Sequence, residues 1–254
     1  GPKSDNNGMT PFELVEPRTL REAAGLLAAG DPSMRPMGGG TAVMLMMKMG
    51  VLRPTRLVSL RGVEERYHEV IEANGELRLG AMATLSALER SAAVRSRAPV
   101  IPRTLRTLAN VRVRNVATVG GHLAHADPHM DLPPVLIALG ATVSTISPKG
   151  GRTLPLEDLY AGYLENALER DELIADVKVA AQGKRRAAYL KCTTRSADDW
   201  PALGVAVVLD AAGRQVREAR IVISAATDVP TRLAAAEQVL KGALMDDKAL
   251  GAAA

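Results

Sequence analysis

The sequence predicts an α+β fold, because its expected strands and helices are grouped rather than alternating. In the last third of the chain, strands are expected at 186–194, 203–209 and 218–226, and helices follow at 231–240 and 248–254. No glycine fingerprint of the Rossmann type is present. No internal repeat of fixed period is found either. Grouping of this kind is typical of an α+β lobe rather than of a doubly wound parallel sheet.

The N-terminal quarter predicts two helices and two short strands. Thr19 begins a capping box, and apolar residues then recur at helical spacing until Gly30 ends the helix. An extended segment at 34–37 leads through three glycines into a second helix, at about 41–49. Residues 55–60 are expected to form a strand.

The middle of the chain predicts a hairpin followed by helices. Segments 68–73 and 76–81 flank Asn74-Gly75, the dipeptide most typical of a tight hairpin turn. A helical stretch is expected at 94–109, bent or divided by its prolines, and another helix at 131–140. Further strands are expected at 141–146 and 152–156.

The composition argues against several classes of protein. The net charge is only +4, from 32 basic and 28 acidic residues, and aromatic residues make up 2% of the chain, so nucleic-acid binding is not expected. A single cysteine, Cys192, can form neither an internal disulfide nor an iron–sulfur cluster. No apolar run reaches the ~18 residues of a membrane span. The sequence therefore predicts a protein of the reducing cytoplasm, with no membrane span.

Two glycine-rich segments carry the chemical signal. The first glycine segment, residues 36–43, reads PMGGGTAV, and the second, residues 117–128, reads ATVGGHLAHADP. Glycine lets backbone N–H groups approach an anion closely, and the first segment also precedes a predicted helix N-terminus. Together they are able to hold the two phosphates of a dinucleotide. Taken singly, each is equally consistent with a tight turn.

Residues 115–134, NVATVGGHLAHADPHMDLPP, closely resemble a signature of the FAD-binding subunits of the molybdenum hydroxylases. That family includes carbon monoxide dehydrogenase and xanthine dehydrogenase. Gly39-Gly40-Thr41 is similar to the first FAD loop of the family, and Asp199-Trp200-Pro201 also occurs in its members. The resemblance extends from about Pro11 to the end of the chain.

The resemblance implies a two-lobed α+β FAD-binding domain of the vanillyl-alcohol-oxidase (PCMH) type, followed by a smaller α+β C-terminal lobe. The expected parts are a tag remnant or flexible start at 1–8, FAD-binding lobe 1 at 9–62, FAD-binding lobe 2 at 63–183 and the C-terminal lobe at 184–254. Because relatives continue with a final helical stretch, a shortened C-terminal lobe is expected here.

The resemblance also implies which residues hold FAD. Backbone N–H groups of 36–43 and 118–122 would hold the pyrophosphate, and Thr41 and Thr118 would add hydroxyl donors. Asp131 would accept hydrogen bonds from ribose or ribityl hydroxyls. The residues implied as FAD contacts are Pro36, Met37, Gly38, Gly39, Gly40, Thr41, Ala42, Val43, Leu108, Thr118, Val119, Gly120, Gly121, His122, Asp127, Asp131, Ile174 and Lys191.

Three of these residues have more particular expectations. Ile174 matches a backbone contact near the adenine, and Lys191 matches a lysine near the flavin, whose charge would favour a reduced anionic ring. His122 replaces the asparagine usual after the two glycines, so its hydrogen bond will differ in geometry. The chain has four tyrosines, so few aromatic side chains are available to stack on the isoalloxazine.

Other conspicuous residues are better explained without a metal. His122, His125 and His129 lie close together in sequence, but no helical pair with a carboxylate base emerges, so no metal ligand is predicted. The methionines near residue 46 are expected to fill a core or the flavin pocket. No acid–base catalytic residue is expected.

The predicted function is that of an FAD-dependent oxidoreductase subunit. It would pass electrons from iron–sulfur centres through FAD to an external acceptor, beside a large molybdopterin-binding subunit and a small 2Fe-2S subunit. Two alternatives stay open: a non-catalytic scaffold subunit that binds flavin or nucleotide, and a free-standing flavoprotein oxidoreductase.

Overall fold

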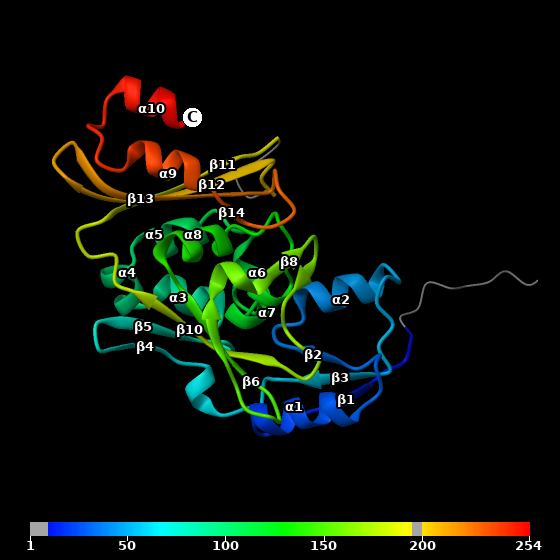
Figure 1. The fold of residues 1–254 in the computed structure, drawn as a ribbon. Coiled ribbons are helices and arrows are strands. Elements are labelled where there is room, and N and C mark those ends of the chain that lie inside the picture. The colour runs from blue at the N-terminus through cyan, green and yellow to red at the C-terminus, as the bar shows by residue number, and fades with distance from the viewer. Residues whose placement is uncertain (1–9, 195–199) are drawn as a thin grey trace, which may run out of the picture.

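The computed structural model describes residues 10–194 and 200–254. The predicted flexible start at 1–8, and Asp199 of the Asp-Trp-Pro motif, lie outside these residues. The three larger sheets are stacked along the molecule, with the N-terminal lobe at the bottom of Figure 1, the central lobe in the middle and the C-terminal lobe at the top. The central and C-terminal lobes group their helices apart from their antiparallel strands, in agreement with the predicted α+β class, whereas strands and helices alternate in the N-terminal lobe.

The N-terminal lobe is a three-stranded parallel sheet of order β1-β3-β2. Thr19 caps its first helix, accepting a hydrogen bond from the Glu22 N–H at 3.0 Å, and the helix buries Leu20 and Leu27. The lobe consists of β1 (Glu13–Val15), α1 (Leu20–Ala29), β2 (Arg35–Met37), α2 (Thr41–Lys48) and β3 (Arg56–Ser59).

The central lobe is a five-stranded antiparallel sheet of order β4-β5-β10-β6-β7. The predicted hairpin is confirmed, with both Asn74 (φ 53°) and Gly75 (φ 79°) in the left-handed region that a tight two-residue turn requires. Its strands are β4 (Val70–Ala73), β5 (Glu76–Gly80), β6 (Thr142–Ile146), β7 (Thr153–Pro155) and β10 (Leu173–Ala180), and a small pair is formed by β8 (Tyr160–Gly162) and β9 (Glu165–Asn166).

A group of short helices covers this sheet. The helical stretch expected at 94–109 is divided between α4 and α5, and Pro99 lies at the start of α5, where its missing N–H costs nothing. The helices are α3 (Leu85–Arg90), α4 (Ala92–Arg97), α5 (Val100–Leu105), α6 (Val111–Arg114), α7 (Val119–Ala124) and α8 (Leu132–Leu139), with 3₁₀ turns η1 (Glu65–Tyr67) and η2 (Leu156–Leu159).

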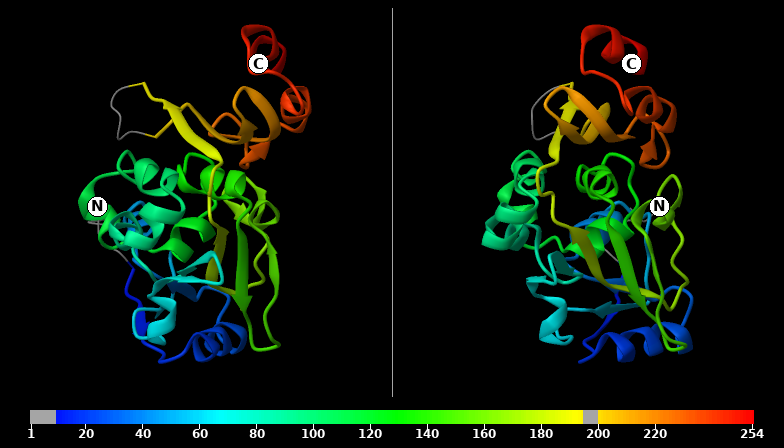
Figure 2. Two further views of the ribbon diagram at one scale, coloured as in Figure 1. Left: turned by 90° about the vertical axis from the view of Figure 1, so that its left-hand side faces the viewer. Right: turned by 60° about the vertical axis from the view of Figure 1, so that its left-hand side comes forward.

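The C-terminal lobe is a four-stranded antiparallel sheet of order β11-β12-β13-β14, and Figure 2 shows it lying across the central helices. Residues 231–232, expected to begin a helix, instead form the short strand β14 beside β13. The elements are β11 (Arg186–Cys192), β12 (Leu203–Ala212), β13 (Gln215–Ser224), β14 (Thr231–Arg232), α9 (Ala234–Leu240) and α10 (Asp247–Ala253).

The hydrophobic core of the central lobe extends into the C-terminal lobe. Helix α8 is buried along its whole length and packs against β12 and β13, which contribute Ala206, Val208 and Val222 to the same cluster. A second cluster joins α1 to Met82 and Leu173 of the central lobe. The expected boundaries at 62/63 and 183/184 fall in connections between these sheets, and they stay predictions.

Candidate functional site

The first glycine segment forms the turn between β2 and the N-terminus of α2. Gly40 is the N-cap of α2, with φ 78°, and no side chain caps the helix. Among the described residues, no hydrogen-bond partner exists for any backbone N–H from residue 38 to residue 43. These six consecutive residues include the first turn of an eight-residue helix, where the helix dipole also favours an anion. The segment therefore has the donors that a pyrophosphate needs.

Close packing fixes the position of this segment. A Cβ on Gly39 would lie 1.9 Å from the backbone oxygen of Val116, and one on Gly38 would lie 2.5 Å from Thr118 Oγ1. Both distances are impossible for a real side chain, so the first glycine segment rests directly on the start of the second. The structure thus brings together the two segments that lie about 80 residues apart in the sequence.

The second glycine segment is a short helix, α7, rather than the open loop that its composition suggests. Thr118 is its N-cap, and Thr118 Oγ1 accepts a hydrogen bond from the Gly121 N–H at 3.2 Å. The Val119 and Gly120 N–H groups donate to the carbonyl oxygens of Ala83 and Ala81, at 2.9 and 2.7 Å. A Cβ on Gly120 would lie 2.8 Å from Ala81 Cβ.

These bonds change the expected role of the second segment. The His122 N–H also has a partner, the Thr118 carbonyl oxygen at 2.9 Å, so the N–H groups of residues 119–122 are all engaged within the chain. This segment supports the first by close packing and exposes the backbone of Gly121, whereas Thr118 is buried. The expected contacts of 118–122 with FAD stay predictions.

His122 is buried in α7 with its Nε2 atom lacking a hydrogen-bond partner among the described residues. Burial lowers the pKa of this imidazole to about 4, so the ring is neutral at physiological pH. A neutral imidazole has one N–H donor and one acceptor. His122 therefore keeps a buried polar atom, Nε2, that has no hydrogen-bond partner in the described part of the chain, at the position of the usual asparagine.

Asp127 is engaged within its own turn. Its Oδ1 atom lies 2.8 Å from both the backbone N and the Nδ1 atom of His129, and the His129 ring stacks on Trp200 with centroids 5.2 Å apart. Trp200 is 63% exposed. The Asp127 carboxylate thus stabilises the loop that leads to α8. Any contact that it makes with FAD would be additional to these internal hydrogen bonds.

Asp131 and Lys191 form a buried ion pair. In the sequence, Asp131 lies 58 residues before Tyr189, and Lys191 lies two residues after it. Lys191 Nζ donates to Asp131 Oδ2 at 3.1 Å and to the Thr107 carbonyl oxygen at 2.6 Å. Tyr189 Oη donates to Asp131 Oδ1 at 2.5 Å. Burial raises the pKa of Asp131, whereas Tyr189 and Lys191 act in the opposite direction. Leu108, next to Thr107, is buried beside this pair.

No role in this cluster was predicted for Tyr189. Its position two residues before Lys191 on β11 was the available signal, because alternate residues of a strand share a face. Gly204 on β12 makes room for it: a Cβ there would lie 2.5 Å from Tyr189 Oη. Ile174 lies elsewhere, buried on β10 opposite Thr145 and next to a bulge.

The described part of the chain has neither a metal-binding cluster nor a membrane-spanning helix. No group of three His, Cys, Asp or Glu side chains is arranged to hold a metal ion in residues 10–194 and 200–254. In the same ranges, no helix is both long enough and apolar enough to cross a membrane.

The N–H groups of residues 38–43, which have no partner in the described part of the chain, lie at a helix start and rest on a second glycine segment, an arrangement expected of a dinucleotide-binding protein. The family model described as "FAD binding domain in molybdopterin dehydrogenase" matches residues 10–181, and that described as "CO dehydrogenase flavoprotein C-terminal domain" matches residues 188–254. The chain belongs to this family of FAD-binding medium subunits, and FAD is its cofactor.

Known proteins agree with this assignment. The chain is 28% identical to the carbon monoxide dehydrogenase medium chain of Hydrogenophaga pseudoflava, covering 96% of this chain and 84% of that one. It is 28% identical to caffeine dehydrogenase subunit beta of a Pseudomonas species, covering 92% and 79%. It is also similar to the solved carbon monoxide dehydrogenase of Hydrogenophaga pseudoflava, with a TM-score of 0.93 and 30% identity over 97% of this chain and 86% of that chain.

A second solved structure, quinoline 2-oxidoreductase of Pseudomonas putida 86, gives a TM-score of 0.90 with 28% identity, covering 97% of this chain and 85% of that chain. These relatives are subunits of oxidoreductases. The expected fold is confirmed, and the chain is an FAD-dependent oxidoreductase subunit.

Proposed function

We propose that this chain is the electron-transfer subunit of a molybdopterin-dependent hydroxylase or dehydrogenase. In this proposal it works beside a large molybdopterin-binding subunit and a small 2Fe-2S subunit, and passes electrons from the iron–sulfur centres to an external acceptor. When bound, FAD supplies the redox chemistry, because its isoalloxazine accepts electrons singly or in pairs. The names of the relatives, which include the medium chain of a dehydrogenase and the medium subunit of a hydroxylase, support this arrangement.

The observation that carries the proposal is the row of backbone N–H groups at residues 38–43. Because each hydrogen bond to a charged group contributes about 1.5–3 kcal/mol, several such donors suffice to hold a pyrophosphate firmly. Thr41 lies exposed in the first turn of α2, where its hydroxyl is open to ligand. Pro36 and Met37, on β2, fix where the segment begins.

The Asp131–Lys191 pair supplies the electrostatics of the proposed flavin pocket. Its charges are shielded from water, with side-chain exposures of 6% and 7%. A cation in such surroundings favours a neighbouring group that gains negative charge. Lys191 would therefore favour the reduced state of a flavin placed beside it, while Asp131 and Tyr189 hold its position.

The remaining predicted contacts complete the site in this proposal. Leu108 would offer an apolar surface, Ile174 a backbone contact near the adenine, and His122 a hydrogen bond near Gly121. Val119 and Gly120 would contribute by packing, since their N–H groups are engaged. We also propose that the complex works in the cytoplasm, in keeping with the single, unpaired Cys192.

The visible absorption spectrum of the purified chain, before and after adding FAD and then dithionite, tests the function. We expect a flavin band that bleaches on reduction, and co-purification with molybdenum-containing and iron–sulfur subunits. Bound FAD that cannot be reduced would favour the scaffold alternative. Substrate turnover by the isolated chain would favour the free-standing oxidoreductase.

A further inference from the structure

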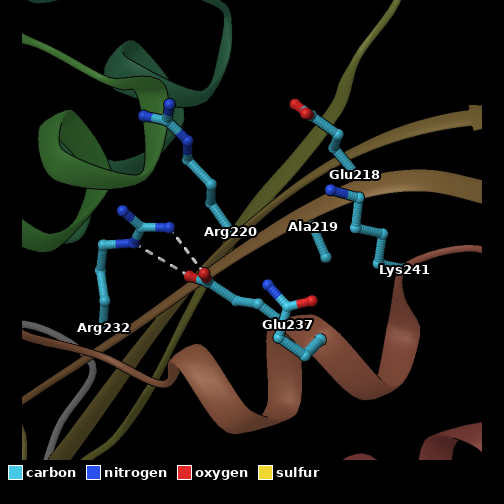
Figure 3. Close-up of a pocket in the computed structure, with 7 residues that line it drawn as sticks. Glu218, Ala219, Arg220, Arg232, Glu237 and Lys241 are labelled. Atoms are coloured by element: carbon cyan, nitrogen blue, oxygen red, sulfur yellow. Dashed lines mark hydrogen bonds and ion pairs between the residues drawn. The ribbon is translucent and has the colours of Figure 1, made fainter.

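A polar cavity lies beside the C-terminal sheet, away from the glycine segments. It has a volume of about 150 Å³ and is lined by Glu218, Ala219, Arg220, Arg232, Glu237, Gln238 and Lys241 (Figure 3). A second cavity, of about 220 Å³, shares Arg220 and Arg232 with the first and reaches the end of α8 and the start of η2. The two arginines therefore lie where the C-terminal lobe meets the central lobe.

Arg232 is already neutralised by carboxylates. Its Nε and Nη2 atoms donate to the two oxygens of Glu237, at 3.1 and 2.6 Å, and Glu157 lies 3.7 Å away. Glu237 Oε1 also accepts the Ile221 N–H at 3.0 Å. Both oxygens of Glu237 are thus used, and Figure 3 shows this pair on one side of the cavity.

Arg220 is different, because its guanidinium makes no hydrogen bond or ion pair with the described residues. It is half-buried, and Figure 3 shows it extending from β13 toward the green helix, α8. The guanidinium lies at the C-terminus of α8, where a Cβ on Gly140 would be 2.5 Å from Nη1. The helix dipole favours a cation there, but it leaves the planar set of N–H donors without an acceptor.

The surroundings of Arg220 carry charges of both signs. Glu218 and Glu237 line the same cavity, and the charge of Arg220 helps to lower the pKa of Glu237, after the larger effects of its hydrogen bonds to Arg232 and Ile221. Arg185 is close enough that Arg220 lowers its pKa, after the larger effect of burial, and Arg185 itself donates to the carbonyl oxygens of Ala181 and Gln182 rather than to a carboxylate. The carboxylates that act on Arg185 are Asp210 and Glu218, neither of which forms an ion pair with Arg220.

The edge of β13 supplies a backbone donor to the same cavity. The Ile221 carbonyl oxygen accepts the Leu233 N–H at 2.8 Å, and the Ile221 N–H donates to Glu237, so this residue faces the β14 side of the strand. Ala219 lies two residues earlier and therefore faces the same edge. Strand β14 is too short to reach it, and the buried Ala219 N–H has no partner among the described residues.

We propose that this cavity binds a phosphate-type oxyanion, through the Arg220 guanidinium, the Ala219 N–H and the Lys241 ammonium. A planar guanidinium combined with a backbone N–H matches the oxygens of a tetrahedral anion. The anion is either free phosphate or the phosphate group of a small phosphomonoester. In the second case Ile137, Ala141 and Leu156, which line the second cavity, receive the organic part.

Isothermal titration of the FAD-loaded protein tests this site, because FAD keeps the glycine segments occupied. With ionic strength held constant by sodium chloride, inorganic phosphate is expected to bind saturably at one site per chain. Arg220→Gln is expected to weaken binding roughly tenfold or more, from the loss of charged hydrogen bonds. Arg217→Gln is the matched control, since Arg217 is on the same strand with its side chain 65% exposed.

Lys241→Gln provides a second variant at an exposed position that will not disturb folding, and it is expected to weaken phosphate binding several-fold. AMP in place of phosphate separates the sources: tighter binding of AMP indicates a phosphomonoester, and equal binding indicates free phosphate. The proposal is overturned if phosphate does not bind saturably, or if Arg220→Gln binds it as the natural sequence does. Neither result would alter the flavin spectrum that tests the electron-transfer function.

Discussion

The two glycine segments show that one sequence signal can serve two physical purposes. In the first, N–H groups from residue 38 to residue 43 have no partner within the described chain. In the second, the N–H groups of residues 119–122 donate to carbonyls or to the Thr118 hydroxyl. The first is arranged to bind an anion, and the second to let two backbones pack closely.

The difference follows from what each glycine touches. Gly40 needs its left-handed conformation to begin α2, and Gly39 needs space beside a backbone oxygen. Gly120 needs space beside Ala81. Glycine content alone therefore does not identify a phosphate-binding loop: the hydrogen-bond state of its N–H groups does.

The largest effect is expected from Gly39→Ala. The new methyl would lie 1.9 Å from the Val116 oxygen, so the segment must move and its N–H donors lose their arrangement. Losing two or more charged hydrogen bonds predicts a fall in FAD affinity of at least roughly 100-fold. A fluorescence titration with FAD measures it, and an unchanged affinity would show that this segment does not hold the cofactor.

Gly25→Ala is the matched control for this change. Gly25 is in α1, and a Cβ there would meet nothing within 4 Å. The substitution is expected to leave FAD affinity unchanged and to stabilise the fold by about 0.5–1 kcal/mol, because alanine loses less backbone entropy in a helix.

Asp131→Asn is expected to cost about 3–5 kcal/mol in the free energy of unfolding, because it removes the buried carboxylate that accepts hydrogen bonds from Lys191 and Tyr189. Urea unfolding measures the loss. Glu13→Gln is the control: it breaks the more exposed pair with Arg56 and should cost no more than about 1 kcal/mol. Equal, small losses in both variants would mean that burial of the Asp131 pair has no energetic consequence.

His122→Asn is expected to flatten the acid dependence of stability. Burial lowers the folded-state pKa of His122 from 6.5 to about 4, so the unfolded chain takes up a proton first as the pH falls. The resulting stability is present above pH 6.5 and is lost as the pH falls toward about 4. Between pH 7 and pH 5 the difference is roughly 2 kcal/mol. Urea unfolding of both proteins at the two pH values measures it, and parallel pH dependences would contradict it.

Thr118→Val is expected to have the smallest effect. Valine keeps the shape but removes the acceptor for the Gly121 N–H, which should cost about 1 kcal/mol of stability. FAD affinity should change little, because the row of N–H groups at 38–43 is untouched. A large loss of FAD affinity without loss of stability would instead make the Thr118 hydroxyl a direct ligand.

Local patterns predicted those parts of the fold that local interactions determine. The capping box at Thr19, the Asn74-Gly75 turn and the prolines of α8 each lead to the expected element. Strand β10 was not predicted, because it begins with a short continuous apolar run, which is ambiguous between helix and strand, and its neighbours β5 and β6 are far away in sequence. Pairing across such separations leaves no local signal.

The site was predictable in the same limited sense. The glycine segments and the residues of the family signature were found, but α7 was not, since two glycines disfavour a helix. The cap at Thr118 and the bonds to Ala81 and Ala83 help to stabilise it. The role of Tyr189 in holding Asp131 depends on a hydrogen bond between two residues that lie 58 positions apart in the sequence.

Residue-resolved amide hydrogen exchange, with and without FAD, tests the contrast between the two segments most directly. FAD is expected to slow exchange of the N–H groups from residue 38 to residue 43, because they gain hydrogen bonds to the pyrophosphate. Exchange at residues 119, 120 and 122 should hardly change, because these groups are already bonded within the chain. Slowing confined to residues 119–122, with 38–43 unaffected, would contradict the assignment of the first segment as the pyrophosphate cradle.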